Sequence, residues 1–381
     1  PLRVMNIPFN KPYLSGKEAD YILEAVRSGQ ISGNGLFTKK CQHWFSTTYG
    51  FKKCLLTTSC TDALEMAALL IAIKPGDEVI VPSYTFVSSA LAFVREGAVI
   101  KFADSRADHP GIDEEKIASL VTEKTKAIVV VHYAGVACDM DKIMEIARKY
   151  KLFVVEDAAQ AIDSYYKGRP LGSIGHLGCF SFHETKNIQC GEGGMLLIND
   201  EQFYQRAEII WEKGTNRTQF FRGEINKYGW VDMGSSFLPS DMLAAFLLAQ
   251  AESIRQIQDR RKTIWQLYHR QLQPLADKGL FGFPVVPSYA TNNAHMFYLV
   301  CESMDQRTGI IQQLKRHNIL AVFHYLSLHR SAFMQQRIAP VELPNADRYS
   351  DNLLRLPLYY ELSEAHIATI CGIITKYLHQ A

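Results

Sequence analysis

Short apolar segments alternate with helical patterns between about residues 50 and 200, and this alternation limits the possible folds more than any other feature. Most of the apolar segments are continuous runs, which are typical of strands covered on both faces. Strands that alternate with helices of about 10–15 residues indicate βαβ units. The pattern predicts an α/β domain with a doubly wound, mainly parallel seven-stranded sheet. The expected strands lie in residues 52–59, 77–84, 98–104, 126–135, 152–160, 176–183 and 193–200.

The pattern changes at about residue 239. Residues 240–277 keep a helical period for nearly their full length, and Ser240 is placed to cap the helix start. Strands are then expected in "HMFYLVCE" (295–302) and "LAVFHY" (320–325), and a last helix in "EAHIATICGIITKYLHQ" (364–380). The sequence therefore predicts two domains. Residues 1–240 form a large α/β domain, and residues 241–381 form a long connecting helix and a smaller C-terminal α+β domain.

Composition excludes several classes of function. The formal net charge is +2 and 21% of residues are charged, so nothing favours nucleic acid or a membrane surface as partner. No apolar run approaches the ~18 residues that a membrane span needs, and the first residues lack the apolar core of a signal peptide. The eight cysteines are scattered without a Cys-x-x-Cys pair, which favours reduced thiols over a disulfide framework or zinc site. We expect a cytoplasmic protein without a metal.

A carboxylate follows one buried strand, because "VVEDAAQ" (154–160) ends in Glu156, Asp157 and then Gln160. A carboxylate just past a buried parallel strand is costly unless it meets a cation. A protonated heterocyclic nitrogen would be such a cation. The alternative is an acid that stabilises the dipole at a helix N-terminus, and this stretch alone leaves both interpretations open.

A hydroxyl-rich segment, "LLTTSCTDAL" (55–64), leads from a strand into a helix. Hydroxyls and free backbone N–H groups at a helix N-terminus form an anion site suited to phosphate. Helix capping explains such residues in most proteins. The segment by itself is therefore a weak indication of a phosphate site.

Lys186 follows the strand-like "HLGCFSFH", five residues after Ser181. A lysine near the carboxyl ends of a buried sheet loses solvation, which lowers its pKa and suits a Schiff base with an aldehyde or ketone. A solvated loop lysine is the alternative, and hairpin chemistry also explains the glycine-rich turn at 191–194. "HETKN" differs from the His-Glu-x-x-His metal motif by having Asn187 as its fifth residue. "SGNGLF" (32–37) lacks the spacing of a dinucleotide fingerprint, so neither a metal nor NAD is expected.

The order of these groups carries more information than each group alone. A phosphate anchor, the aromatic "SYTF" at a strand end, an acid and then a Ser/Lys pair resemble the pyridoxal-phosphate aminotransferases of fold type I. More narrowly, the chain resembles the DegT–StrS family of sugar-nucleotide aminotransferases, from "IPFNKPYL" to "LRLPLYYELSE". "EKGTNRTQFFRG", "GSSFLPSD" and "NAHMFY" are similar to the branch that makes dTDP-4-amino-4,6-dideoxygalactose for cell-surface glycans such as enterobacterial common antigen or O-antigen.

The resemblance implies pyridoxal 5′-phosphate as the cofactor. Lys186 would hold it through a Schiff base and would later shuttle a proton. Asp157 would pair with the pyridinium nitrogen and keep it protonated, so that the ring acts as an electron sink. Phe86 would stack on the ring face, and Gln160 would lie near the ring hydroxyl, where many relatives carry a histidine.

The resemblance also implies phosphate contacts from Cys60, Thr61 and Ser181. Ser236 stands where many family members carry an asparagine supplied by the neighbouring subunit. A shorter hydroxyl at this position would still reach toward phosphate. Because the family builds its site at a dimer interface, a homodimer with a shared active site is implied.

The implied reaction moves the amino group of L-glutamate to C4 of dTDP-4-keto-6-deoxy-D-glucose. The same reaction with the opposite stereochemistry, which gives the gluco amine, is an alternative that sequence motifs do not exclude. Sugar dehydratases of the same fold replace the lysine with histidine, so Lys186 argues against them, and a non-catalytic regulatory protein has no need of that lysine. The residues expected to face the substrate, each of which could equally be structural, are Gly33, Asn34, Arg217, His324, Tyr325 and His329.

Overall fold

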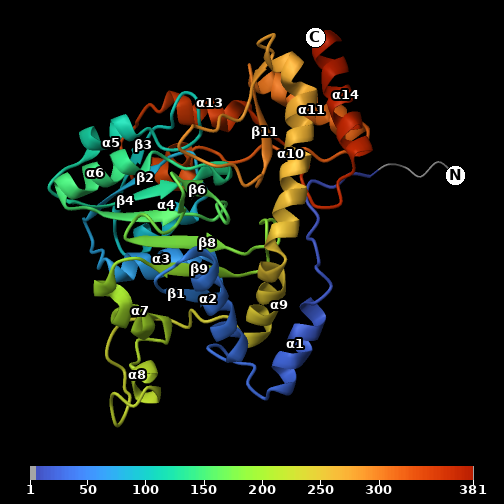
Figure 1. The fold of residues 1–381 in the computed structure, drawn as a ribbon. Coiled ribbons are helices and arrows are strands. Elements are labelled where there is room, and N and C mark those ends of the chain that lie inside the picture. Colours follow the sequence, from blue (N-terminus) through green and yellow to red (C-terminus); the bar gives the residue numbers. More distant parts are fainter. Residues whose placement is uncertain (1–5, 381) are drawn as a thin grey trace.

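The computed structural model describes residues 6–380, and its centre is a seven-stranded sheet (Figure 1). The strands are β1 (Cys54–Thr57), β2 (Glu78–Pro82), β3 (Val99–Ala103), β4 (Thr125–Val131), β5 (Phe153–Asp157), β8 (Leu177–Ser181) and β9 (Gly194–Ile198). They follow the order β1-β9-β8-β5-β4-β2-β3, and all except β9 run in the same direction. Each strand coincides with one of the seven expected segments. The predicted α/β fold with a mainly parallel sheet is confirmed.

Helices cover both faces of this sheet, which explains why its strands are continuous apolar runs. In β4, Ala127 and Val129 face one hydrophobic core, whereas Ile128 and Val130 face the other. The first face is covered by α3 (Cys60–Leu70), α4 (Ser88–Arg95) and α7 (Tyr204–Trp211). The second face is covered by α2 (Leu36–Tyr49), α5 (Glu114–Leu120), α6 (Met140–Tyr150) and α9 (Asp241–Glu252).

A smaller domain with its own core follows at the C-terminal end. Its antiparallel sheet consists of β10 (Phe281–Gly282), β11 (Phe297–Cys301) and β12 (Leu353–Leu356). Three helices pack around it: α10 (Ile254–Ala276), α11 (Met304–Arg316) and α14 (Glu364–Gln380). The expected strand in 295–302 and the expected helix over 364–380 are both confirmed. Two shorter helices, α12 (Ala332–Gln335) and α13 (Pro344–Asn352), lie between β11 and α14 in the sequence. The large domain also contains a short hairpin of β6 (Tyr165–Tyr166) and β7 (Arg169–Pro170).

The expected strand in "LAVFHY" (320–325) is wrong. Only Val322 forms a bridge there, to Arg355, and the third strand of the small sheet is β12 instead. Leu320 and Phe323 are both about half exposed and Ala321 is the buried apolar residue between them, so this segment buries much less apolar surface than a sheet strand would. In β12, by contrast, Leu353, Leu354 and Leu356 are buried.

The prediction of a single long helix over residues 240–277 is wrong, because two helices span these residues. The helical stretch is interrupted at Ser253, where α9 ends and α10 begins. The expected cap is present, because the Ser240 hydroxyl accepts a hydrogen bond from the Leu243 N–H at 3.4 Å. The helical period of the sequence continues across Ser253, so it does not reveal the interruption.

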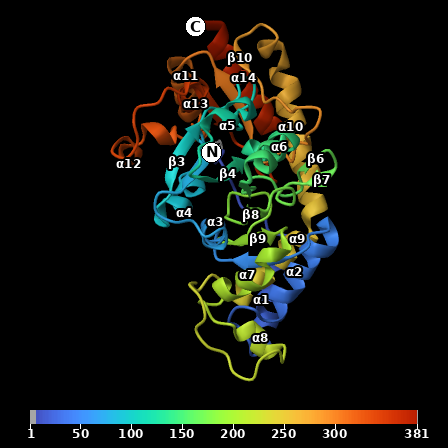
Figure 2. The same cartoon turned by 90° about the vertical axis from the view of Figure 1, so that its left-hand side faces the viewer.

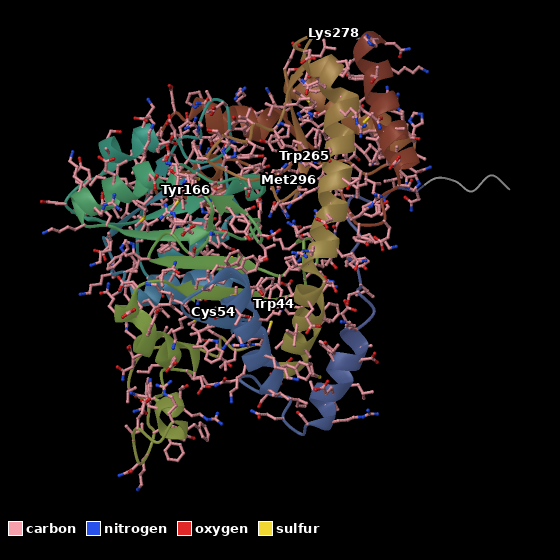
Figure 3. The ribbon with its side chains drawn as sticks, in the orientation of Figure 1. Trp44, Cys54, Tyr166, Trp265, Lys278 and Met296 are labelled. Carbon is pink, nitrogen blue, oxygen red and sulfur yellow. The ribbon has the colours of Figure 1, made fainter. Side chains whose placement is uncertain are left out.

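The two cores meet along α9 and α10. Buried residues of α9 belong to the core of the large sheet, whereas Ile264 and Tyr268 of α10 belong to that of the small one. Trp265 of α10 contacts Phe297 of β11, with ring centroids 5.2 Å apart. Figure 3 shows Trp265 and Met296 in this region, and Met296 belongs to the core of the large sheet. The junction thus places the start of β11 between the two domains.

The chain before α2 packs against both domains. Ile7 is buried in the core of the small domain, and α1 (Glu18–Arg27) packs against α9. The predicted domain limits at 240 and 241 coincide with the start of α9 and stay a prediction.

The short helix α8 (Arg217–Phe221) projects from the large domain. It lies at the end of the molecule opposite to α14 in both views (Figures 1 and 2). Within residues 6–380, none of the helices combines the length and the apolar character that spanning a membrane requires.

Candidate active site

A cavity of about 440 Å³ lies where the carboxyl ends of the parallel strands face the small domain. Parallel α/β sheets commonly bind ligands at this edge. One wall consists of residues that follow β1, β2, β5 and β8, and the other contains residues of the small domain. The cavity is lined by these residues that the sequence singled out: Cys60, Thr61, Phe86, Asp157, Gln160, Ser181, Lys186, His324 and Tyr325.

Lys186 lies in the loop between β8 and β9, as the sequence indicated. Its backbone N–H donates to the His183 carbonyl at 2.9 Å, which forms a turn. Burial lowers the pKa of the Lys186 amine to about 8, and the positive charge of Arg355 acts in the same direction. At pH 7 roughly a tenth of such amines are neutral, against about one in 2,500 for an ordinary lysine. The amine is therefore suited to attack a carbonyl carbon.

The residue after this lysine fixes the loop to the small domain. The Asn187 amide donates to Gln258 Oε1 at 2.7 Å and to the Asn293 carbonyl at 2.8 Å. Its Oδ1 is 2.9 Å from His295 Nδ1. Asn187 stands where the His-Glu-x-x-His metal motif would have its second histidine. Its side chain is buried, and both its amide nitrogen and its oxygen have hydrogen-bond partners. Within the described chain, no three His, Cys, Asp or Glu side chains are grouped so that they could hold a metal ion.

Asp157 ends β5 and is only 5% exposed. Its carboxylate accepts hydrogen bonds from the Ser89 hydroxyl at 2.6 Å and from the Ala159 N–H at 3.1 Å. No basic side chain between residues 6 and 380 forms an ion pair with it, and burial raises the pKa of the carboxyl. A cationic group bound in the cavity would stabilise its ionised form. Ser89 of α4, which the sequence analysis did not single out, supplies the hydroxyl that holds this acid.

The start of α3 forms another part of the wall. The Ser59 hydroxyl caps the helix by accepting from the Asp62 N–H at 3.0 Å, and the Thr61 hydroxyl is 2.7 Å from that of Ser88. The strand β9 begins against this turn: a Cβ at Gly194 would clash with the backbone of Ser59. The first N–H groups of a helix lack intrahelical partners, so this turn can bind a phosphate dianion.

Two further side chains complete the large-domain wall. Ser181 is the last residue of β8, and its hydroxyl accepts from the His183 N–H at 3.3 Å. The Phe86 side chain is 54% exposed although it lines the cavity. Its ring lies 6.1 Å from the ring of Tyr325. An aromatic ring with an open face at a cavity can stack on a flat ligand.

A hydrogen-bonded chain links the two walls. Gln160 Oε1 accepts from the Ala134 N–H at 2.6 Å, and its amide donates to the Tyr325 hydroxyl at 2.9 Å. Tyr325 stacks on His324 at 3.5 Å, and His324 Nδ1 is 2.7 Å from the Tyr133 hydroxyl. Burial holds the pKa of His324 well below its usual range. His324 is therefore a neutral group at this site.

Four of the singled-out residues do not line the cavity, and they lie in or against the segment 212–238. The Asn34 amide donates to Glu212 Oε1 at 3.3 Å, and Ser236 is bridged to the same Glu212. Gly33 packs closely against Leu238. Arg217 is exposed on α8, where its guanidinium lies 5.0 Å from the Phe221 ring centroid. Asn34 and Ser236 share Glu212 as a neighbour, and none of the four residues lines the cavity of its own chain.

His329 also lies outside the cavity. Its Nδ1 is 2.7 Å from the Ser83 hydroxyl, and its Nε2 is 3.6 Å from Asp347. Burial lowers the pKa of this imidazole. It borders a separate hollow next to residues 338–344. Its observed contacts connect the segment after residue 327 to the end of β2.

The sequence of the chain matches a known family over nearly its whole length. Residues 12–375 match the DegT/DnrJ/EryC1/StrS aminotransferase family. The spore coat polysaccharide biosynthesis protein SpsC of Bacillus subtilis is 32% identical, over 94% of this chain and 93% of its own. The GDP-perosamine synthase of Caulobacter vibrioides is 30% identical, over 96% of this chain and 97% of its own.

The fold is similar to that of solved sugar aminotransferases. One is Spr1654 from Streptococcus pneumoniae, described as a candidate sugar aminotransferase. Its PMP-form has a TM-score of 0.91 and 27% identity, and the match covers 98% of this chain and 100% of that one. Its PLP-form has a TM-score of 0.90, and the match covers 99% of both chains. The cavity contains what such a cofactor needs: an amine, a buried acid without a cation, and a helix start. The chain belongs to the DegT/DnrJ/EryC1/StrS aminotransferase family, the pyridoxal-phosphate-dependent sugar aminotransferases of fold type I.

Proposed function

We propose that the protein transfers the amino group of L-glutamate to C4 of dTDP-4-keto-6-deoxy-D-glucose, giving dTDP-4-amino-4,6-dideoxy-D-galactose for a cell-surface glycan. The observation that supports an amino transfer is that Lys186 and Asp157 line the same cavity. One is an amine whose pKa burial lowers to about 8, and the other is a buried acid without a counter-ion among the described residues. The choice of sugar rests on the motifs at 212–223, 234–241 and 293–298.

We assign the cofactor contacts as follows. Lys186 Nζ would hold pyridoxal phosphate covalently, and Asp157 would face its ring nitrogen and keep it protonated. Ser89 and the Ala159 N–H hold that carboxylate in place. Phe86 covers the ring face, and Gln160 lies at the edge of the site with one amide hydrogen already donated to Tyr325. The phosphate contacts are Cys60, Thr61 and Ser181, with Ser236 contributed by a second subunit.

The chain's own groups then perform the proton transfers. Bound pyridoxal phosphate supplies an electron sink for the substrate carbon that loses its proton. Lys186 Nζ removes that proton and returns one in the second half of the cycle. The buried carboxylate of Asp157 stabilises a positive charge placed opposite it, and the rings of Phe86 and Tyr325 form one side of the cavity. Asp157, Phe86 and Tyr325 line the same cavity as Lys186, so they can act on one bound substrate.

The substrate assignment is tested by incubating the purified protein with dTDP-4-keto-6-deoxyglucose and L-glutamate. We expect a single aminated sugar nucleotide, in which NMR coupling constants at C4 give the galacto configuration. The gluco configuration would contradict the proposed product but not the proposal that the protein is an aminotransferase. Because one relative is named for a GDP-linked sugar, GDP-4-keto-6-deoxymannose is the matched competitor. A preference for it would contradict the choice of nucleotide. An absorbance of the bound cofactor that does not respond to L-glutamate would contradict the amino donor.

We also propose a homodimer built on the region around α8. Exposed apolar patches commonly mark interaction surfaces, and here Phe221, Trp230 and Met233 are 67%, 81% and 64% exposed. The cluster of Asn34 and Ser236 lies at the same region, outside its own chain's cavity. A second copy that covers this region would bring Ser236 toward its partner's cavity.

The dimer is tested by the double variant Phe221→Asp, Trp230→Asp in sedimentation velocity. Buried aromatic anchors each contribute about 2 kcal/mol or more to an interface, so we expect the dimer dissociation constant to rise at least about 100-fold, with loss of activity at low protein concentration. The control is Met304→Asp, an exposed apolar residue of α11 in the small domain, which leaves the dimer unchanged. A monomeric wild type would refute the shared site.

A further inference from the structure

Two buried hydroxyls form a hydrogen-bonded chain that ends on Asp157. The Ser89 hydroxyl donates to Asp157 Oδ2 at 2.6 Å, and its oxygen lies 2.8 Å from the Thr85 hydroxyl oxygen. A serine hydroxyl carries one hydrogen. Because Ser89 gives that hydrogen to the carboxylate, the Thr85 hydroxyl donates to Ser89. This hydroxyl chain therefore runs from Thr85, which lines the cavity, through Ser89 to the acid.

Backbone contacts fix each member of the hydroxyl chain. Thr85 follows β2 directly and is buried. Ser89 lies in the first turn of α4, where its N–H donates to the Phe86 carbonyl at 3.2 Å. Asp157 ends β5, and its Oδ1 accepts from the Ala159 N–H at 3.1 Å. The two hydroxyls thus meet the carboxylate in a direction that is set when the protein folds.

The charged groups near Asp157 do not replace the hydroxyl chain. Burial raises the pKa of the carboxyl, and the charges of Lys186 and His132 oppose that rise. Neither group forms an ion pair with Asp157: His132 Nε2 lies 2.8 Å from Glu156, and the Lys186 amine is the group proposed to hold the cofactor. Three further side chains near the carboxylate are neutral, because burial raises their pKa values: Cys60, Cys179 and Tyr325.

We propose that Thr85 and Ser89 are positioning residues that hold Asp157 as a carboxylate, so that the site selects a cofactor with a protonated ring nitrogen; this rests on the proposed contact between Asp157 and pyridoxal phosphate. Hydrogen bonds donated to a carboxylate favour its ionised form. A hydroxyl that itself accepts a hydrogen bond is a stronger donor, which is the contribution of Thr85. The acid is then ready to face a cation without reorganising.

The test compares pyridoxal phosphate with 1-deazapyridoxal phosphate, in which a C–H group replaces the ring nitrogen. Both compounds carry the same aldehyde and phosphate, so the ratio of their dissociation constants reports on the charge at that ring position. In the cofactor-free full chain, we expect Ser89→Ala to raise the dissociation constant of pyridoxal phosphate about 10- to 100-fold, because a hydrogen bond to a charged group is lost. The constant of the deaza compound should not rise, whereas a purely structural loss would raise both alike.

Two substitutions of Thr85 separate the hydroxyl from the rest of its side chain. Thr85→Val replaces the hydroxyl by a methyl group and should change the same ratio by about threefold to tenfold, since Ser89 stays but loses its donor. Thr85→Ser keeps the hydroxyl and should restore the ratio of the wild type. The matched control is Ser88→Ala in the same turn of α4, where the Ser88 hydroxyl lies 2.7 Å from that of Thr61. Any effect there should be equal for both compounds, because both carry the phosphate.

A second readout needs no cofactor. Without the Ser89 hydrogen bond the pKa of Asp157 rises further, so its carboxyl should stay protonated to a higher pH in Ser89→Ala than in the wild type. Infrared spectroscopy follows this through the carboxyl band that Asp157→Asn removes.

The outcomes distinguish the hydroxyl chain from the cofactor contact on which it rests. A ratio that changes in Asp157→Asn but stays constant in Ser89→Ala and Thr85→Val would overturn the role of the hydroxyls and leave the contact intact. A constant ratio in Asp157→Asn would refute the contact between the acid and the ring nitrogen, and the role of the hydroxyls with it. Neither result depends on the amino donor or the sugar, because no substrate is present.

Discussion

Replacing Lys186 by alanine is expected to lower the rate of amino transfer at least about 10⁴-fold, since the nucleophile and the proton carrier are removed together. Among the described residues that line the cavity, Lys186 is the one amine, and Arg355 is the one guanidinium. The rate is measured by the formation of aminated sugar nucleotide. Borohydride reduction followed by peptide mass analysis should place the cofactor on Lys186 in the wild type and nowhere in the variant.

The matched control for this variant is Lys142→Ala, an exposed lysine on α6 that pairs with Glu115. It should keep full activity and the reducible label. If Lys186→Ala retained wild-type turnover, the assignment of the reactive amine would be wrong. If the control lost activity as well, the loss in Lys186→Ala would not report on the cavity.

Replacing Asp157 by asparagine is expected to lower the turnover rate roughly 10³-fold, comparable to the loss of one preorganised electrostatic contact in other active sites. The amide oxygen can accept from the Ala159 N–H, and the amide NH₂ can donate to the Ser89 hydroxyl oxygen in place of the bond that the carboxylate accepted, but the amide cannot stabilise a protonated ring nitrogen. Because burial already raises the pKa of the acid, the change should leave the free energy of unfolding of the cofactor-free protein within about 1 kcal/mol. Steady-state kinetics and thermal unfolding measure the two effects separately.

Asp141→Asn, at an exposed position of α6, serves as the control for removal of one carboxylate. It should change neither turnover nor cofactor affinity. An Asp157→Asn protein that unfolds early would show that the carboxylate is structural. A stable variant with normal turnover would show that the ring nitrogen needs no acid.

Much of the fold follows from the sequence, because strands buried on both faces leave a distinct apolar signature. All seven strands of the central sheet and helix α14 could be predicted in this way. The apolar pattern of residues 320–325 predicts a strand, but Leu320 and Phe323 are half exposed, whereas His324 and Tyr325 line the cavity. The interruption at Ser253 was missed because one residue in a non-helical conformation does not disturb a helical period.

The site was predicted in outline rather than in detail. Residues at strand ends, such as Asp157 and Lys186, could be singled out because topology brings the ends of parallel strands to one edge. Ser89, Asn187 and Arg355 could not, since their contacts join segments that are far apart in the chain. Gly33, Asn34, Arg217 and Ser236 keep their predicted roles only together with a second subunit, and His329 has the contacts of a structural residue. Their roles stay predictions.

The reversed direction of β9 has a consequence for the conformational entropy of the loop that carries Lys186. A parallel partner would require the chain to cross to the opposite edge of the sheet before it re-entered. With β9 reversed, the chain re-enters at the same edge, so both ends of the loop 182–193 are held by adjacent hydrogen-bonded strands. The freedom of this doubly tethered loop is therefore lost when the protein folds and not when a ligand binds.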